Sequence, residues 1–528
     1  MKNKFYITTP IYYPSNKLHI GHAYSTVLVD VYARFRRMQG YETYFLTGSD
    51  EHGLKIEQSA EKAGMSPQAF VDEQVKGFKN LWKKLEISND DFIRTSQDRH
   101  KNTVQQIFDD MIKKDDIYLG EYEGWYCVHE ETFWTESQVG PDHLCPECHR
   151  PVTKASEETY FFRTNKYLPE LLKYMDEHPK FLFPLSRKNE MINTFIKPGL
   201  DDLSVSRTSF TWGIPVLANP KHVTYVWLDA LTNYISALGY KSEDDSLFQK
   251  FWADENTEII HVVGADITRF HAIYWPMFLL SEGLRLPDRI FVHGLLMMKD
   301  GKMSKSRGNT VDPVPLIDRY GVDAVRYYLV RETTFGSDGQ FTPEQFVERI
   351  NIDLANDFGN LLHRSISMIQ KYFDGVIPAY KGDITPFDKE LRELAEETVN
   401  DYEEKMADLK ITEAFISVFK LISSANKYID NTEPWNLKKN EKTEELASVM
   451  NHLANALYIA GTLLQPVLPH ASAGLFEQLG VEDKIRDYQL VHKFGVLGGQ
   501  TVNKGQPLFP RLDVEEELAY IKSLMNGN

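Results

Sequence analysis

Two short segments far apart in the chain contain residue types that stabilise negative charge on a phosphate. The first is His19-Ile20-Gly21-His22, and the second is Lys302-Met303-Ser304-Lys305-Ser306. Imidazole N–H groups and lysine ammonium groups donate to phosphate oxygens, and a glycine without a Cβ lets a nucleotide approach the backbone. Attack on the α-phosphate of ATP places negative charge on those oxygens, so donors held there lower the barrier. Together the two segments predict an enzyme that forms an adenylate.

The elements predicted around the histidines place them where phosphates bind. We expect strands at 5–8 and 43–46, a loop at 10–17, and a helix over 21–38 that ends before Gly40. A strand, a helix and a second strand in this order form a unit of a parallel sheet, whose ligands bind at the carboxyl ends of the strands and at helix N-termini. The simpler alternative is two histidines of a core or a surface, and it leaves the lysine-rich segment without an explanation.

Composition and charge exclude several classes of protein. A chain of 528 residues is too long for one core, and we expect roughly three or four domains. The 59 basic and 76 acidic residues give a net charge of −17, which disfavours indiscriminate binding of nucleic acid but allows a local basic face. No apolar stretch is long enough to span a membrane and no signal-peptide core follows Met1, so we expect a cytoplasmic protein without a membrane partner. The three cysteines lie within 127–148, and their odd number argues against a disulfide framework.

The order of predicted elements divides the chain into five regions. An α/β pattern is interrupted by a segment rich in aromatic residues, turns and cysteines, then resumes, and long helical periodicity follows. The resumed pattern contains predicted strands at 222–227, 258–263 and 289–292 and a helix over 267–281. The five regions are 1–115, 116–221, 222–294, 295–345 and 346–528. This order predicts an α/β fold: a Rossmann-type parallel-sheet catalytic domain with an inserted domain at 116–221, followed by an α-helical bundle.

Three further motifs are similar to the substrate-pocket motifs of one family. They are Thr47-Gly48-Ser49-Asp50-Glu51-His52-Gly53, Tyr225-Val226-Trp227-Leu228-Asp229-Ala230, and Arg269-Phe270-His271 followed by Trp275-Pro276. With the histidine and lysine segments they make the chain resemble the class I methionyl-tRNA synthetases over essentially its whole length. The resemblance implies that the enzyme activates L-methionine with ATP and Mg²⁺ and then transfers it to the 3'-terminal ribose of tRNA(Met). It also implies a monomer, a connective domain at 116–221, a KMSKS loop with a stem-contact region at 295–345, and an anticodon-binding bundle at 346–528.

The resemblance also implies the residues of the active site. Methionine is a flexible, polarisable thioether, which sulfur–aromatic contacts and apolar packing recognise well. The implied methionine pocket consists of Ile11, Tyr13, Trp227, Ala230, Tyr234, Phe270 and His271, with the carboxylate of Asp50 on the α-ammonium group. The implied ATP contacts are His19, Gly21, His22, Gly264, Asp266, His293, Gly294, Met303 and Lys305. Of these, His19, His22 and Lys305, together with Lys302, would stabilise the transition state, whereas the alternative for the aromatic residues is an ordinary core.

A helical segment of the predicted bundle has one polar face. Over 351–373 the apolar residues Phe358, Leu361, Leu362, Ile366, Ile369 and Phe373 recur at helical spacing. Asn356, Asn360 and Arg364 fall on the opposite face, where they could read base edges, and an aromatic ring can stack an unpaired base. The resemblance assigns Asn360, Arg364 and Trp435 to the CAU anticodon. Without it, a solvated face and a buried tryptophan would be the simpler interpretation.

The inserted region departs from the family pattern at its cysteines. Many members bind zinc through two Cys-x-x-Cys pairs. Here Cys145-Pro146-Glu147-Cys148 is intact, but the first pair is Cys127-Val128-His129-Glu130. We expect one structural Zn²⁺ on Cys127, Cys145 and Cys148. The fourth ligand is His129, which has the better ligand chemistry, or Glu130, which has the matching position, and His143 and His149 are also near in sequence. The alternative is a decayed site held by hydrogen bonds and packing.

Two other classes of protein remain as hypotheses. A nucleotidylyltransferase shares the histidine signature, but such enzymes are much shorter and lack a helical bundle of this length. A tRNA-binding paralogue without catalytic activity should have lost some of the signature histidines and lysines, and all of them are present. Pyrophosphate exchange measured with each of the twenty amino acids distinguishes the three hypotheses.

Overall fold

Two units make up the structure, a computed structural model that describes residues 2–129, 132–134, 136–298, 301–302, 310–333 and 336–526. The first unit contains Met1–Leu18, Glu42–Lys83 and Ser88–His293. The second contains His19–Tyr41, Lys84–Ile87 and Gly294–Asn528. No helix in the described part of the chain has the length and apolar character that crossing a membrane requires.

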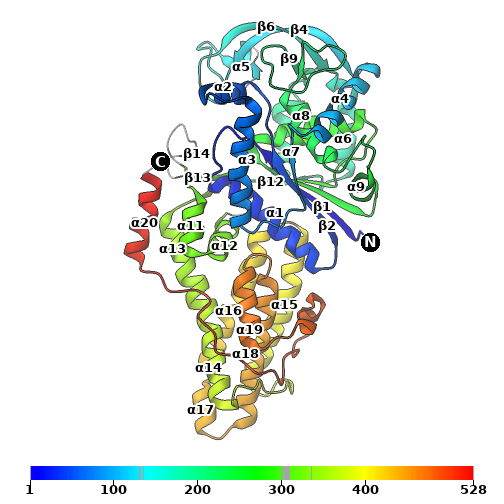
Figure 1. The fold of residues 1–528 in the computed structure, drawn as a ribbon. Coiled ribbons are helices and arrows are strands. Elements are labelled where there is room, and N and C mark those ends of the chain that lie inside the picture. Colours follow the sequence, from blue (N-terminus) through cyan, green and yellow to red (C-terminus); the bar gives the residue numbers. More distant parts are fainter. Residues whose placement is uncertain are drawn as a thin grey trace. The chain divides into compact units, whose positions relative to one another are not determined.

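A parallel sheet at the centre of the first unit confirms the predicted α/β class (Figure 1). Its strand order is β3-β2-β1-β11-β12-β7, and every neighbouring pair is parallel. The strands are β1 (Lys4–Tyr12), β2 (Glu42–Ser49), β3 (Asp91–Arg94), β7 (Leu182–Phe183), β11 (Thr257–Gly264) and β12 (Arg289–His293). Most side chains of β1, β11 and β12 are buried, as expected for parallel strands covered on both faces. The strands predicted at 5–8, 43–46, 258–263 and 289–292 all lie in this sheet.

β1 continues beyond its predicted end because the sheet accommodates a proline. The pairing of β1 with β2 shifts between Thr8 and Ile11. Pro10 has no N–H to donate to the ladder, and a bulge is one of the few places where a strand tolerates it. The hydroxyl oxygens of Thr9 and Thr47 lie 2.7 Å apart and join the two strands beside the bulge. The start of the predicted loop at 10–17 is therefore strand, and β1 carries Ile11 to the carboxyl edge of the sheet.

Two predicted elements of the first unit are wrong in detail. The run at 222–227 is not a strand of the parallel sheet: β10 (Val223–Thr224) pairs with β9 (Ser206–Arg207), and α8 (Val226–Ser236) begins at once. The helix predicted over 267–281 is a 3₁₀ turn (Ala265–Ile267), a π-helix (Phe270–Tyr274) and α10 (Trp275–Ser281). Pro276 occupies the first turn of α10, where its missing N–H is tolerated.

The first unit contains several further helices besides α8 and α10. They are α2 (Leu54–Lys62), α3 (Pro67–Lys84), α4 (Asp98–Lys113), α6 (Thr164–Glu177), α7 (Leu185–Glu190), α9 (Ser246–Phe248), and π-helices at Met191–Ile196 and Gln249–Ala253. Trp252, Trp275 and Tyr6 are among the largest fully buried side chains of this unit. The main apolar core therefore includes residues of the sheet, of α8 and α10 and of the π-helix at Gln249–Ala253.

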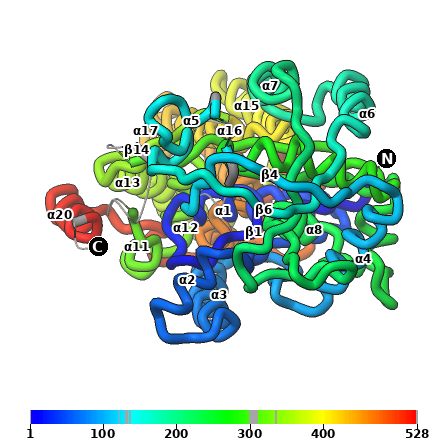
Figure 2. Tube along the Cα trace, turned by 90° about the horizontal axis from the view of Figure 1, so that it is seen from above, coloured from blue at the N-terminus to red at the C-terminus, as the bar shows by residue number. Residues whose placement is uncertain are grey.

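An antiparallel sheet forms the inserted region. Its order is β5-β4-β6-β8, with β4 (Ile117–Cys127), β5 (Thr132–Trp134), β6 (Thr153–Phe162) and β8 (Leu203–Ser204), and α5 (Glu136–Val139) follows β5. Figure 2 shows β4 and β6 running side by side. Leu182 and Phe183, inside the predicted insertion 116–221, form β7 at the edge of the parallel sheet instead. The chain thus returns to the catalytic sheet before the insertion is complete.

The second unit begins with the helix that follows β1 in the chain, α1 (Ile20–Met38), close to its predicted bounds. Asp30 of α1 forms an ion pair with Arg326 of α12 at 2.6 Å, and both side chains are fully buried. The nearby elements are β13 (Leu296–Met298), β14 (Gly301–Lys302), α11 (Pro313–Tyr320), α12 (Val322–Glu332), β15 (Gly339–Gln340) and α13 (Pro343–Arg349). The ion pair holds α1 against α12.

Helices fill the rest of the second unit, as predicted from residue 346 onward. They are a π-helix (Ile350–Gly359), α14 (Asn360–Phe373), α15 (Asp388–Ala407), α16 (Ile411–Thr432), α17 (Pro434–Lys439), α18 (Thr443–Leu464), α19 (Pro469–Leu479), two 3₁₀ turns (Asp483–Ile485 and Tyr488–His492) and α20 (Val514–Asn526). α15, α16 and α18 pack against one another (Figure 1). The helix predicted over 351–373 is π-helical in its first part, and Phe373 is only half-buried.

Candidate functional site

His19 and His22 cap the N-terminus of α1. Nδ1 of His19 accepts the backbone N–H of Gly21, and Nδ1 of His22 accepts the backbone N–H of His19, each at 3.1 Å. A neutral imidazole that accepts through Nδ1 carries its proton on Nε2. A Cβ at position 21 would lie 2.9 Å from the His19 ring, so the cap itself needs the glycine. The arrangement thus prepares two Nε2–H donors beside a helix N-terminus, where anions bind.

The lysine segment is described only at its start. Lys302 ends β14, whose backbone pairs with Met297 of β13. Met303 and Lys305 lie outside the described residues. Gly294, which the sequence assigned to the nucleotide, also has a packing role, because a Cβ there would lie 1.9 Å from the carbonyl oxygen of Ser337.

Three residues predicted to bind ribose and adenine lie at the carboxyl edge of the parallel sheet. Gly264 of β11 and His293 of β12 are register partners at the ends of their strands. Asp266 follows in the 3₁₀ turn and is exposed, whereas His293 is buried. Ligands of open parallel sheets bind outside this edge. The three residues therefore lie where a nucleotide is expected.

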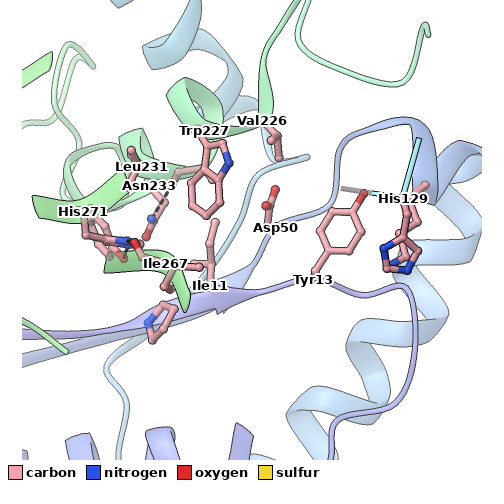
Figure 3. Close-up of a pocket in the computed structure, with 14 residues that line it drawn as sticks. Ile11, Tyr13, Asp50, His129, Val226, Trp227, Leu231, Asn233, Ile267 and His271 are labelled. Atoms are coloured by element: carbon pink, nitrogen blue, oxygen red, sulfur yellow. Dashed lines mark hydrogen bonds between the residues drawn. The ribbon is translucent and has the colours of Figure 1, made fainter. Parts of the chain in front are cut away.

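A cavity of about 270 Å³ opens beside the ends of β1 and β2 (Figure 3). Residues from several separate segments of the first unit line it, and they include Ile11, Tyr13, Asp50, Trp227, Ala230, Tyr234 and His271. Phe270 stacks on Trp227, with ring centroids 3.7 Å apart and an interplanar angle of 6°. The structure thus brings together all the residues predicted for the methionine pocket.

Different elements position these side chains. Ile11 follows the bulge of β1, and Asp50 follows the last residue of β2. Trp227, Ala230 and Tyr234 are spaced three and four residues apart on α8, so they share one face of this helix. His271 lies in the π-helix, a wider turn that is common at functional sites. The cavity therefore depends on the parallel sheet, α8 and the π-helix together.

The hydrogen bonds at the buried end of the cavity are made within the protein. The hydroxyl of Tyr234 donates to Nε2 of His271 at 2.7 Å, and Nδ1 of His271 donates to the carbonyl oxygen of Ile267 at 3.0 Å. Burial lowers the pKa of His271 to about 4, so the ring is neutral near pH 7. Tyr234 is 1% and His271 3% exposed, and we call their end the deep end of the cavity.

A buried carboxylate joins two walls of the cavity. Oδ2 of Asp229 lies 2.6 Å from Nδ1 of His52, and Oδ1 lies 2.7 Å from Nε2 of His100. Burial by itself would raise the pKa of Asp229, but the two imidazoles outweigh it and hold this pKa below its usual range. His52 follows Asp50 in the chain, and Asp229 precedes Ala230. The Asp229 carboxylate therefore fixes the Asp50 segment against α8.

A second ionic network holds the same segment. Glu51 is fully buried and receives bonds from Arg94 at 2.7 and 3.0 Å and from Ser96 at 2.5 Å. Arg94 also bonds to Asp72. With Glu51 and His52 both fixed, the backbone that carries Asp50 has little freedom to move.

Sequence reasoning missed several lining residues, of which Lys55, His129 and Asn233 are the polar ones. Lys55 could have been noticed because it follows Asp50 by five residues at the start of the next helix. His129 was considered only as a metal ligand. Asn233 has no signal of its own beyond its place beside Tyr234 on α8.

The three cysteines come together in the inserted region. Their Sγ atoms all lie within 4.8 Å of one another, and those of Cys127 and Cys148 are 3.5 Å apart. Tetrahedral zinc with Zn–S bonds of about 2.3 Å holds sulfur atoms about 3.8 Å apart, so the cluster has suitable dimensions. Within the described residues no fourth ligand atom joins the group. His129 lines the cavity instead, and Glu130 lies outside the described residues.

The residues predicted for the anticodon lie near one another in the second unit. Arg364 of α14 forms an ion pair with Asp430 of α16 at 3.0 Å, and Asn360 is exposed one helical turn before Arg364. Trp435 is 46% exposed on α17, which follows the end of α16. An exposed ring of this size can stack an unpaired base. The simpler interpretation, a buried tryptophan, is wrong.

Comparison with known proteins gives the same family over both units. The family described as tRNA synthetases class I (M) matches residues 5–156 and 149–366, and the family described as the anticodon binding domain of methionyl tRNA ligase matches residues 377–525. A methionine–tRNA ligase of Halalkalibacterium halodurans is 56% identical over 99% of this chain and 81% of its own length. One of Bacillus subtilis is 55% identical over 100% of this chain and 80% of its own length.

A solved structure shares the fold over nearly the whole chain. The methionyl-tRNA synthetase of Mycobacterium tuberculosis in complex with methionyl-adenylate is 40% identical, with a TM-score of 0.90, over 97% of this chain and 100% of that chain. The apo form of the same enzyme has a TM-score of 0.84 at 37% identity, over 97% of this chain and 99% of that chain.

The deep end of the cavity yields a prediction about stability. Tyr234→Phe removes the hydroxyl that donates to His271 and leaves a buried acceptor without a partner. We expect the free energy of unfolding to fall by about 1–3 kcal/mol, measured by denaturant unfolding. Tyr174→Phe is the matched control in the same unit, because its hydroxyl makes only a long bond of 3.4 Å to Pro287. Equal losses in the two variants would contradict the importance of the Tyr234–His271 bond.

Proposed function

This chain belongs to the methionine–tRNA ligases of class I, and we propose that the cavity beside Trp227 binds the methionine that is activated. The observation that carries the proposal is the division of the cavity into a charged and an apolar part. Asp50 offers a carboxylate to the α-ammonium group, and the Trp227–Phe270 stack offers an aromatic wall to the thioether. At the deep end Tyr234 and His271 already bond to each other, which suits a sulfur atom that is only a weak acceptor.

The first step consumes ATP. The methionine carboxylate attacks the α-phosphorus, a new C–O–P bond forms, and the bond to pyrophosphate breaks. Negative charge grows on the phosphoryl oxygens, and donors already in place stabilise it without reorganisation. We assign this task to the Nε2–H groups of His19 and His22 and to Lys302 and Lys305. In the second step the terminal ribose hydroxyl of tRNA attacks the activated carbonyl, and AMP leaves.

ATP is assigned to residues beside both the histidine segment and the lysine segment. Gly264, Asp266 and His293 would hold ribose and adenine at the carboxyl edge of the sheet, and Gly21, Gly294 and Met303 complete the ATP contacts. Mg²⁺ supplies positive charge to the polyphosphate. The described residues contain no group of three carboxylates that would form a cage for it, so the phosphates of ATP would hold Mg²⁺.

The helical bundle is proposed to read the CAU anticodon through Asn360, Arg364 and Trp435. Asp430 keeps the Arg364 guanidinium in a fixed direction, and Trp435 presents an exposed ring. The proposed boundaries are those of the sequence: a catalytic domain in two halves, 1–115 and 222–294, a connective domain at 116–221, a KMSKS and stem-contact region at 295–345, and the anticodon bundle at 346–528. The exception is β7, which lies within 116–221 but belongs to the catalytic sheet. We propose that the protein is a cytoplasmic monomer.

A shorter nucleotidylyltransferase does not account for the match of the bundle to an anticodon binding domain.

An activity assay distinguishes this enzyme from a paralogue without catalytic activity. We expect exchange of pyrophosphate into ATP with methionine and with no other standard amino acid at comparable efficiency. Exchange with no amino acid would support the paralogue.

Asp50 provides the sharpest test of the methionine assignment. Asp50→Asn removes the charge opposite the ammonium group, so kcat/KM for methionine in pyrophosphate exchange should fall about tenfold or more, with KM for ATP little changed. Glu61→Gln, an exposed residue of α2, is the control and should behave as the wild type. Equal effects of Asp50→Asn on both substrates would indicate a structural role instead.

The anticodon assignment is tested in the second unit. Trp435→Ala should weaken charging of tRNA by about 1–3 kcal/mol in kcat/KM, because a base loses its stacking partner, and methionine-dependent exchange should be unchanged. Phe387→Ala, at another exposed aromatic ring of the bundle, serves as the control. Normal charging of tRNA by Trp435→Ala would refute the assignment.

The cysteine cluster predicts a metal content of about one zinc ion per chain. Elemental analysis of protein purified without chelator measures it. Removal of zinc should speed hydrogen exchange in β4 and β5 and in residues 136–152 before it affects the parallel sheet, because the small cluster around Trp134 has few other apolar contacts. Metal-free protein whose exchange in this segment is already slow would contradict the prediction and favour a decayed site.

A further inference from the structure

The cavity has a charged end whose residues the sequence did not assign to methionine. Figure 3 shows Asp50 between the deep end, marked by His271, and Tyr13 with His129 at the opposite end. Lys55 also lines the cavity, and its Nζ lies 5.9 Å from the centre of the Tyr13 ring. Lys55, Tyr13 and His129 therefore form one group, which we call the polar mouth. All three are half-buried.

A free amino acid brings two charges into this cavity. The Asp50 carboxylate would pair with the ammonium group. The carboxylate of the ligand also needs donors when it leaves water, since an unpaired buried charge is unfavourable by several kcal/mol. Three donors at the deep end already have partners within the protein. The Tyr234 hydroxyl donates to His271, Nδ1 of His271 donates to Ile267, and the amide of Asn233 donates to Ala230 at 2.6 Å.

The order of groups along the cavity fixes the direction of the ligand. With the side chain at the deep end and the ammonium group at Asp50, the carboxylate of methionine faces the polar mouth. The ammonium of Lys55 is the one lysine charge among the lining residues of this cavity, and a charge-assisted bond from it is about twice as strong as a neutral one. His129 adds a ring N–H on the far side of Tyr13.

We propose that Lys55 and His129 bind the carboxylate of methionine and hold it for attack on ATP. The proposal rests on the function proposed above for this cavity. Lys55 supplies the charge that the carboxylate needs, and His129 sets its orientation as a donor from a different element. Both would touch substrate, so they are further binding residues of the same reaction and not supports for other side chains.

The position of His129 connects the inserted region to the active site. His129 follows Cys127 by two residues, in the turn after β4, and Cys127 is one of the three clustered thiols. A cluster that holds this turn also holds the His129 ring at the polar mouth. The inserted region thereby contributes a substrate contact as well as its own fold.

The test compares two ligands that differ only in the group concerned. Methioninol keeps the ammonium group and the thioether side chain of methionine but has a neutral hydroxymethyl group in place of the carboxylate. We expect Lys55→Met to weaken binding of methionine about tenfold, measured by calorimetry on the full chain, and to change binding of methioninol by less than about twofold. His129→Ala should act in the same direction with a smaller factor. Lys55→Arg, which keeps the charge, should retain most of the affinity for methionine.

Two controls separate this inference from the function on which it rests. Asp50→Asn should weaken both ligands, because both carry the ammonium group. Lys62→Met, an exposed lysine of the same helix, should change neither. If Lys55→Met and His129→Ala leave methionine binding unchanged, or weaken methionine and methioninol equally, the carboxylate contact is refuted while the cavity keeps its ligand. If the wild-type chain binds neither compound, the proposed function fails and this inference fails with it.

Discussion

The cavity beside Trp227 depends on the bonds that join the Asp229 carboxylate to His52 and His100. The carboxylate is fully buried, so it is tolerable only with partners, and His52 and His100 provide them at 2.6 and 2.7 Å. Removing either imidazole would leave a buried charge with half of its compensation, at a cost of about 3–5 kcal/mol. Because His52 adjoins the Asp50 segment and Asp229 lies between Trp227 and Ala230, this requirement sets the distance between Asp50 and the Trp227–Phe270 stack.

In the second unit, a buried ion pair beside α1 likewise needs hydrogen-bonding partners. Arg326 and Asp30 are both fully buried, and the remaining guanidinium N–H groups donate to the carbonyl oxygens of Leu85, Pro466 and Val467. A planar guanidinium can satisfy several acceptors in fixed directions, which a lysine cannot. Arg326 therefore joins the helix that begins with the two signature histidines to α12 and to the segment that follows α18. The direction of the Nε2–H donors of His19 and His22 depends on this ion pair as well as on the cap of the helix.

Much of the fold and of the site could be predicted from the sequence, and the failures have physical causes. Strands buried on both faces are continuous apolar runs, so β1, β2, β11 and β12 were recognisable, and the pocket residues followed from motifs of the family. The bulge at Pro10 and the π-helix at Phe270–Tyr274 follow from tertiary contacts that periodicity does not encode. The run at 222–227 has strand composition, but α8 is buried on most of its surface, and burial favours apolar residues in either conformation.

His129 shows most clearly why residue type and spacing were not enough. Its imidazole, two residues after Cys127, made it a candidate metal ligand, although the Cys-x-x-Cys spacing pointed to Glu130. Which way a side chain points from a tight turn depends on the turn and on what packs beside it. In the structure the three thiols form the cluster and the imidazole lines the cavity. The sequence contained the right residues but not the direction in which they point.

The distribution of hydrogen-bonding groups along the cavity explains how methionine is chosen over polar amino acids of similar length. A glutamine side chain would bring an amide to the deep end, where Tyr234 and the neutral His271 already satisfy each other. That amide would lose its bonds to water and find no free partner in this pair. Oδ1 of Asn233, a buried acceptor without a bond, could compensate only one of its N–H groups, so the loss disfavours it. Methionine brings only a thioether, whose desolvation is nearly free and whose sulfur contacts aromatic rings favourably. In the proposed binding mode, selectivity against polar side chains would therefore come from the paired Tyr234 and His271, and recognition of an amino acid would come from the charges at the other end.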